Sequence, residues 1–146
     1  MNRFLTLTML LFTGINLPGQ DTIEIKGRVI SKSGSYLPGT NVVLHNTTVG
    51  TVTDACGQFK IKIPKDRQGH LSLSMISNPF YFDLRQIKDE DLDKEVILRI
   101  MSFDEKMKMR NKKQHNLKYN CVDYKDKTIT FRIPNDRSKW PGKTDK

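Results

Sequence analysis

Three histidines, two cysteines and a run of acidic residues are the side chains in this sequence that could support catalysis or bind a metal. His45, His70 and His115 begin the stretches "HNTT", "HLSL" and "HNLK". None of these has the H-x-x-E or H-E-x-x-H spacing of a zinc site. The favoured interpretation is that all three histidines lie on the surface or in turns.

A cysteine nucleophile would require Cys121 to lie beside His115 and Asp123. On one strand, His115 would lie six residues from Cys121, which is too far apart for a proton relay. We therefore expect no catalytic site. A small hydrolase remains a third interpretation, after two kinds of binding module.

The acidic run between Asp89 and Glu95 is the strongest candidate for a cation site. It lacks the glycine and the ordered oxygen ligands of a calcium-binding loop. A solvated connection between two strands explains it more simply, and we expect neither a metal nor a cofactor. Its members are Asp89, Glu90, Asp91, Asp93 and Glu95.

Cys56 and Cys121 are the only cysteines. An even number of cysteines permits a disulfide in an exported protein, but two cysteines this far apart form no recognisable framework. Two unpaired thiols are an alternative of at least equal weight.

The N-terminus has the pattern of a secretory signal peptide. Arg3 precedes the apolar run "FLTLTMLLF", which is followed by the breaker-rich "TGINLPGQ". Such a run is too short to span a bilayer, and cleavage is expected near Gln20. We therefore predict an exported protein that resides in the periplasm, associates with the outer membrane or is secreted.

The positive charge of the chain is concentrated towards its C-terminus. The formal net charge is +9, but residues 21–100 carry eleven Lys and Arg against ten Asp and Glu, whereas residues 101–146 carry thirteen against six. Such asymmetry favours either a solvated tail or a surface for anionic polymers, without specific recognition of nucleic acid. The candidate contacts are Lys106, Lys108, Arg110, Lys112 and Lys113.

Between these ends, short segments alternate in side-chain character and are separated by turn residues. "QFKIKIP" is the clearest, with Phe59, Ile61 and Ile63 on one face and lysines on the other. Seven such segments without a long helix predict an antiparallel β-sandwich. The core residues expected beside these three are Val29, Val42 or Val43, Leu71, Leu73 and Ile97, and Gly27 is interpreted as a bulge.

The stretch "TVGTVTDACGQFKIKIP" predicts a tight reversal between two strands. Asp54 can accept hydrogen bonds from backbone N–H groups, and Gly57 can adopt a positive φ that other residues resist. Asp54 is therefore interpreted as a turn former and not as an acid catalyst. Pro38-Gly39 fits the centre of another turn, of type II.

These segments together resemble the carboxypeptidase-like regulatory domain, a transthyretin-like sandwich of exported Bacteroidetes proteins. The likeness covers roughly residues 23–100 and departs from the usual pattern after Ile76, where "SNPFYF" replaces Gly followed by Tyr or Phe. The matching residues are Gly27, Val29, Leu37, Pro38, Gly39, Val42, Gly50, Thr51, Thr53, Asp54, Gly57, Phe59, Leu71 and Ser74.

The resemblance implies a module without chemistry of its own. Domains of this kind accompany metallocarboxypeptidase domains or precede the plug and barrel of TonB-dependent receptors. We expect a non-catalytic accessory module acting with a cell-envelope protein, and the alternative is a basic module that binds lipopolysaccharide, acidic glycan or lipid headgroups. The expected segments are a signal peptide at 1–20, the sandwich at 21–100, a basic linker at 101–116, a β-hairpin extension at 117–133 and a disordered basic tail at 134–146.

Overall fold

The structure is a computed structural model of the chain, and it describes residues 19, 21–75, 79–101, 121, 127–134 and 141. The predicted signal peptide, basic linker and C-terminal tail fall almost entirely outside these residues and stay predictions. Within the described ranges, the structure contains no helix with the length and hydropathy of a membrane span.

Strands dominate the described part of the chain, and the two 3₁₀ helices are short. The elements follow in the order β1 (Thr22–Ser31), β2 (Asn41–Leu44), β3 (Gly50–Val52), β4 (Gln58–Pro64), β5 (His70–Ser74), β6 (Phe80–Asp83), η1 (Leu84–Gln86), η2 (Asp89–Asp91), β7 (Glu95–Ile100) and β8 (Thr128–Ile133).

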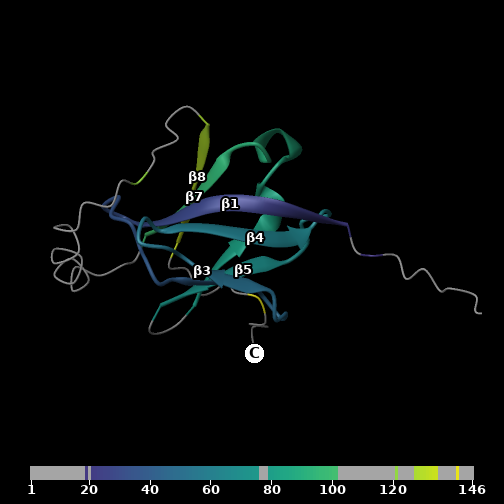
Figure 1. Cartoon of the computed structure of the whole chain (residues 1–146), viewed down its shortest axis with the longest axis horizontal. Helices are drawn as coiled ribbons and strands as arrows, with labels where there is room; N and C mark the ends of the chain where they lie inside the picture. Colours follow the sequence, from purple (N-terminus) through teal and green to yellow (C-terminus); the bar gives the residue numbers. More distant parts are fainter. Residues whose placement is uncertain are drawn as a thin grey trace, which may run out of the picture.

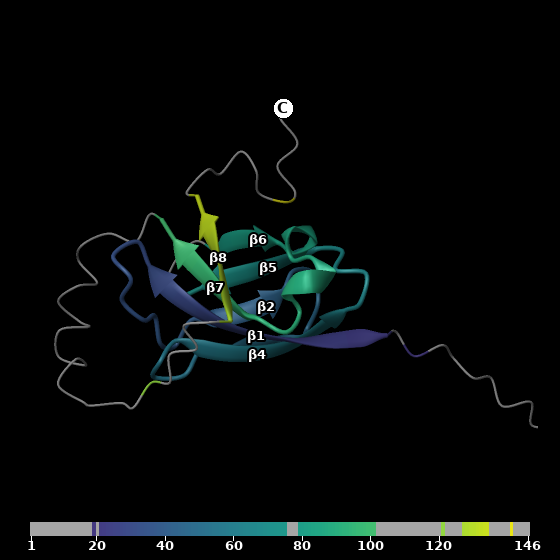
Figure 2. The same cartoon turned by 90° about the horizontal axis from the view of Figure 1, so that it is seen from above.

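Two four-stranded sheets pack face to face, as Figures 1 and 2 show from two directions. The first sheet has the order β4-β1-β7-β8, and the second has the order β3-β2-β5-β6. The predicted all-β sandwich is confirmed. Seven strands lie within residues 21–100, as predicted, and β8 is an eighth beyond them. The expected antiparallel pairing was wrong in one detail, because β7 pairs in parallel with both β1 and β8. Parallel neighbours require long connections, which the intervening second sheet and residues 101–127 provide.

The core lies between the sheets and is formed by alternate residues of the strands. In β4 the burial alternates as predicted, with Phe59, Ile61 and Ile63 inside and the lysines between them exposed. The prediction for β7 was wrong by one residue: Val96 and Leu98 face the core, and Ile97 is only half-buried on the opposite face. In "EVILRI" the charged residues Glu95 and Arg99 lie on the same face of the strand as Ile97, so the alternation indicated Val96, Leu98 and Ile100 as the buried residues.

β1 runs through both pairings without a break, so the predicted bulge at Gly27 was also wrong. Gly27 is paired with Phe59 of β4 on one side and with Val96 of β7 on the other. The glycine serves a packing role there, which is described with the site below.

The segment that departs from the expected pattern still yields a strand. β6 pairs antiparallel with β5, from His70 opposite Asp83 to Leu73 opposite Phe80. Phe82 is buried, and η1 follows directly with Leu84 also buried. The sandwich is therefore maintained along "FYFDL".

β8 lies beyond the predicted 21–100 domain and yet forms the fourth strand of the first sheet. Its Ile133 is buried, and its Phe131 ring packs against Phe82 of the second sheet with 5.0 Å between ring centroids. A packed strand was expected here as half of a hairpin. The other half of that hairpin lies outside the described residues, apart from Cys121.

Candidate functional site

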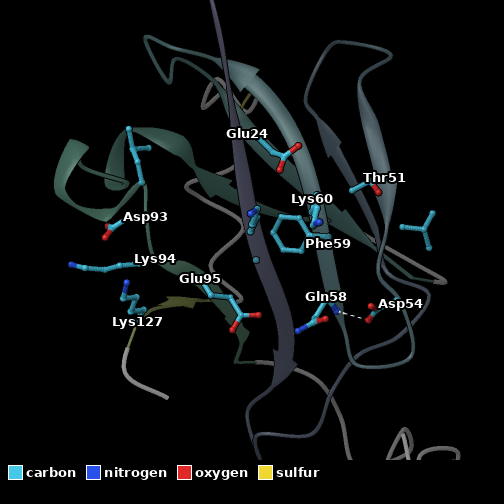
Figure 3. A pocket seen from close by; sticks show the side chains of 14 residues that line it. Glu24, Thr51, Asp54, Gln58, Phe59, Lys60, Asp93, Lys94, Glu95 and Lys127 are labelled. Atoms are coloured by element: carbon cyan, nitrogen blue, oxygen red, sulfur yellow. Dashed lines mark hydrogen bonds between the residues drawn. The ribbon is translucent and has the colours of Figure 1, made fainter. Parts of the chain in front are cut away.

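A groove of about 890 Å³ crosses the face of the first sheet around β1 and β4. Figure 3 shows β1 crossing its middle. Asp93, Lys94, Glu95 and Lys127 lie on one side of that strand, and Thr51 and Asp54 lie on the other. The groove thus joins segments that are more than seventy residues apart in the sequence.

The charged groups of the groove balance one another. Four carboxylates and four lysine ammonium groups line it, and the lining contains no histidine, serine or cysteine. Such a lining offers hydrogen bonds and charges of both signs, but it has no nucleophile paired with a base. The charged groups are Glu24, Asp54, Asp93, Glu95, Lys26, Lys60, Lys94 and Lys127.

The middle of the groove depends on the contact between Gly27 and Phe59. A Cβ added to Gly27 would lie 2.5 Å from Cζ of the Phe59 ring and 2.6 Å from the carbonyl oxygen of Val96. The ring therefore occupies the space that a side chain at position 27 would take. Since Phe59 is only 4% exposed, the glycine allows an aromatic ring to close the core beneath the groove.

Two ion pairs define the wall formed by η2 and β7. Arg28 lies with its Nε 3.3 Å from Oε1 of Glu95, and both side chains are almost fully buried. The Arg28 guanidinium also lies 5.1 Å from the ring centroid of Tyr36. Removing one partner from such a pair leaves a charge without compensation, so the Arg28–Glu95 pair fixes where β7 meets β1.

The second pair joins Lys94 to Asp91, with 2.8 Å between Nζ and Oδ1. Asp91 is 4% exposed and immediately precedes Leu92, which lines the groove. The hydrogen bond from Lys94 is the main cause that lowers the pKa of Asp91, and burial acts in the opposite direction. The same hydrogen bond raises the pKa of Lys94. The central residue of the acidic run, Asp91, is therefore paired with Lys94 and is not free to bind a cation.

Two other acids of that run, Asp89 and Glu90, also lie beside basic side chains. Asp89 lies 2.6 Å from the guanidinium of Arg67, and Glu90 lies 3.8 Å from the ammonium group of Lys88. Among the residues that the structure describes, no three His, Cys, Asp or Glu side chains are grouped in a way that could hold a metal ion.

The turn between β3 and β4 forms the opposite end of the groove. Oδ1 of Asp54 accepts hydrogen bonds from the backbone N–H groups of Cys56 (2.9 Å) and Gln58 (2.8 Å). Gly57 has a φ of +70°, and a Cβ there would lie 2.7 Å from the carbonyl oxygen of Val29. Both residues therefore have the geometry of turn formers, and the carboxylate of Asp54 is occupied by the backbone.

The other residues of the sequence motif hold this turn against its neighbours. The buried Thr53 hydroxyl donates to the carbonyl oxygen of Leu37 at 2.7 Å and accepts from the N–H of Thr40 at 2.8 Å. The N–H of Gly39, which has a φ of +70° and follows Pro38, donates to the Thr53 carbonyl oxygen. Gly50 begins β3 of the second sheet, and Phe59 lies in β4 of the first sheet. The motif residues therefore form the connection by which the chain passes from one sheet to the other.

Cys56 and Cys121 form a disulfide with 5.6 Å between their Cα atoms. Of the two alternatives left open by the sequence, the structure has the bonded one. The bridge ties the β3–β4 turn to the segment that precedes β8. With its sulfur bonded in this way, Cys121 does not present a free thiolate to His115 or Asp123, both of which lie outside the described residues.

The other predicted contacts are not brought into the groove. The ring of His45, in the turn after β2, packs edge-on against Tyr81 at 5.0 Å between centroids, and His70 begins β5 of the second sheet. The five predicted anion contacts lie outside the described residues: Lys106, Lys108, Arg110, Lys112 and Lys113.

Sequence reasoning missed most of the groove. In the sequence, Lys26 and Lys60 occupy ordinary exposed positions of alternating strands. The residues next to them in the sequence do not indicate that Asp93 and Lys127 line the same groove. One signal was available: Arg28 interrupts an apolar stretch of β1, and a buried arginine requires a partner. The sequence did not show that this partner is Glu95, 67 residues away.

A comparison with protein families matches residues 25–99 to the CarboxypepD_reg-like domain. The matched region begins within β1 and ends within β7, and it thus covers most of both sheets. The chain belongs to the CarboxypepD_reg-like domain family. This is the family whose resemblance the motif residues carry, and its domains are of a non-catalytic, regulatory or accessory type. Neither curated proteins nor solved structures give a match to the chain.

Proposed function

We propose that this CarboxypepD_reg-like protein is an exported accessory module that acts by binding a partner protein of the cell envelope. It works in the periplasm or at the outer membrane and carries out no reaction itself. The observation that carries the proposal is the Cys56–Cys121 disulfide. Disulfides persist in oxidising compartments and are rare in the reducing cytosol, so the bridge supports export together with the N-terminal pattern.

The groove supports a protein as the partner. Its four carboxylates and four ammonium groups suit a surface that carries charges of both signs. With Glu95 paired to Arg28 and Lys94 paired to Asp91, a strongly anionic polymer would be repelled by the three other carboxylates as much as it would be attracted by the three other lysines. Nothing in the described part of the chain therefore favours the anionic-polymer alternative over a protein.

Complex formation in the native host tests this proposal. A tagged full-length chain is cross-linked in intact cells, the cells are fractionated, and the cross-linked products are sized. The expected result is an envelope-associated complex of defined mass. Lys60→Glu in the groove should diminish it, whereas Lys65→Glu, an equally exposed change in the β4–β5 connection, should not.

Two outcomes would contradict the proposal. The chain could be recovered alone from the cytosolic fraction, which would remove both export and the partner. Alternatively, the complex could persist equally in both variants, which would remove the groove as the contact and leave export standing.

A further inference from the structure

The outward faces of the two sheets differ in charge. In the second sheet, the outward positions of the strands carry no lysine or arginine, and their one acidic residue, Asp83, is paired with Arg85. In the first sheet, the outward positions carry six basic residues and two acidic ones. The basic residues are Lys26, Arg28, Lys60, Lys62, Arg99 and Arg132, and the acidic residues are Glu24 and Glu95.

Two lysines lie directly opposite one another on the outward face of the first sheet. In the antiparallel pairing of β1 with β4, Lys26 is the partner of Lys60, and the next outward pair is Glu24 with Lys62. Like charges directly opposite each other on one face of a sheet are destabilising. The three lysines are exposed, and none of the ion pairs formed among the described residues includes them. Lys26, Lys60 and Lys62 together form the lysine face.

Protection of a sheet edge explains only part of this arrangement. β4 is an edge strand, and lysines on an edge strand discourage the addition of another strand. Lys26, however, lies on β1, which has β4 on one side and β7 on the other. An inner strand needs no such protection. The repulsion between Lys26 and Lys60 therefore has a cause other than the edge.

We propose that the lysine face binds an acidic segment of the partner protein, with one carboxylate seated between the ammonium groups of Lys26 and Lys60. Directly opposite residues of an antiparallel pair have Cβ atoms about 5 Å apart, so both lysines can donate charge-assisted hydrogen bonds to the same carboxylate. Binding then replaces a repulsion with two attractions. Both lysines line the groove, in which Figure 3 shows Lys60 close to β1.

The neighbouring acids favour a discrete carboxylate over a polyanion. Glu24 lies one outward position from Lys26 along β1, and Asp93 lies on the other side of that strand (Figure 3). A continuous series of anionic groups laid along the groove would meet both acids, whereas one acidic side chain between the two lysines would not. The lysine face therefore suits a protein segment better than an anionic polymer.

This chain is itself a poor source of the acidic segment. The residues outside the described ranges carry twelve Lys and Arg against six Asp and Glu, so their overall charge has the same sign as the lysine face. A second copy carries a formal net charge of +9 and is repelled likewise. Charge complementarity therefore selects a different, acidic protein as the occupant.

The inference rests on the proposed function, because it names the chemistry by which the groove contacts its partner. Its test uses purified protein and a peptide, whereas the proposed function is tested by complex formation in cells. A peptide that does not bind would leave export and the cellular complex standing. A chain recovered alone from the cytosol would remove the cellular partner and leave the peptide result standing.

Isothermal titration calorimetry of the oxidised, purified chain measures its affinity for an acidic peptide. The probe is the acetylated and amidated heptapeptide Gly-Ser-Asp-Glu-Asp-Ser-Gly, and the control peptide has the corresponding amide in place of each of the three acids. The acidic peptide should bind and the amide peptide should not. Added salt should weaken the binding, because it screens exposed ion pairs.

Glutamine variants locate the contact on the lysine face. Lys26→Gln and Lys60→Gln should each weaken binding of the acidic peptide about threefold, and the double variant about tenfold, as expected for two exposed ion pairs. Glu24→Gln removes the neighbouring carboxylate and should strengthen binding. Lys65→Gln is the control, because it removes the same charge from an exposed position in the β4–β5 connection, and its affinity should stay within about twofold of that of the unmodified chain.

Melting temperatures without any peptide give a second readout. Because Lys26 and Lys60 repel each other, Lys26→Gln should raise the melting temperature of the unmodified chain more than it raises that of the Lys60→Gln variant. Equal shifts in the two backgrounds would show that the two lysines do not interact, and the paired arrangement on which the inference depends would be lost.

Four binding results would also overturn the inference. Equal affinity for the acidic and amide peptides would remove the carboxylate contact. Equal losses in Lys65→Gln and Lys26→Gln would show that only the net charge matters. A larger loss of affinity for heparin, a sulfated glycan, than for the peptide in the double variant would identify an anionic polymer as the occupant. A carbodiimide cross-link formed without peptide, from Lys26 or Lys60 to an acid of residues 102–146 or of another copy, would show that the chain itself occupies the lysine face.

Discussion

Replacing Gly27 by alanine puts a methyl group into space that the Phe59 ring already occupies. The new Cβ would lie 2.5 Å from Cζ of the ring and 2.6 Å from the carbonyl oxygen of Val96, both about 1 Å closer than ordinary contact. Overpacking of a closed core costs roughly 1 to 3 kcal/mol. We expect a loss of about 3 kcal/mol, near the upper limit, because one of the two contacts is backbone of the neighbouring strand β7.

A double-mutant cycle separates the two contacts. Leucine at position 59 lacks the distal ring atoms, so Gly27→Ala should cost about 1 kcal/mol less in a Phe59→Leu background than in the unmodified chain. The remaining cost comes from the Val96 carbonyl oxygen, which the second substitution does not move. Phe59→Ala alone should cost about 3 to 5 kcal/mol through the cavity it leaves.

Denaturant unfolding at constant temperature measures these free energies, provided that the slope with denaturant is unchanged. Lys26→Ala is the matched control, since it changes the neighbouring exposed residue of β1 and should cost less than about 0.5 kcal/mol. The reasoning is refuted if Gly27→Ala costs no more than that control, or if its cost is the same in both backgrounds.

Three further changes test the turn, the disulfide and the acid response. Asp54→Asn should leave stability nearly unchanged, because asparagine still accepts the backbone hydrogen bonds, whereas Asp54→Ala should cost about 1 kcal/mol. Gly57→Val should cost more than Asp54→Ala. Equal melting temperatures of all three variants would contradict this interpretation of the turn. Cys56→Ser opens a loop of 65 residues and should cost about 4 kcal/mol by the chain-entropy estimate, and a melting curve that is unchanged by reductant would oppose it. Lys94 lowers the pKa of Asp91 in the folded chain, so the ionised Asp91 stabilises the fold above its unfolded pKa, and this stabilisation is lost as the pH falls through the folded pKa. The free energy of unfolding of Asp91→Asn should therefore decrease less steeply with falling pH than that of the unmodified chain. Identical slopes of the two chains would contradict the pairing.

The parts of the fold that local chemistry determines could be predicted from the sequence. Alternation in "QFKIKIP" fixes which face of β4 is buried, and the positions of Asp54 and Gly57 define the turn that precedes it. These features depend on residues a few positions apart, so a single sequence contains the necessary information.

Features that depend on distant pairing could not be predicted in this way. The parallel arrangement of β7 and β8 depends on a connection of some 27 residues, and the sequence of a strand does not indicate which strand it pairs with or in which direction. Gly27 was interpreted as a bulge because its real partner, the Phe59 ring, comes from a strand more than thirty residues away. The groove is a product of the same long-range pairings, so its residues were seen only as separate surface charges.

Mass spectrometry of the chain isolated from its native cells tests the central claim most directly. Cells are lysed in the presence of an alkylating reagent, and the intact mass is measured before and after reduction. An exported module should begin near Gln20 or Asp21, carry no alkyl group before reduction and take up two groups after it, at Cys56 and Cys121. A chain that retains Met1 and is alkylated at both cysteines before reduction would contradict the account.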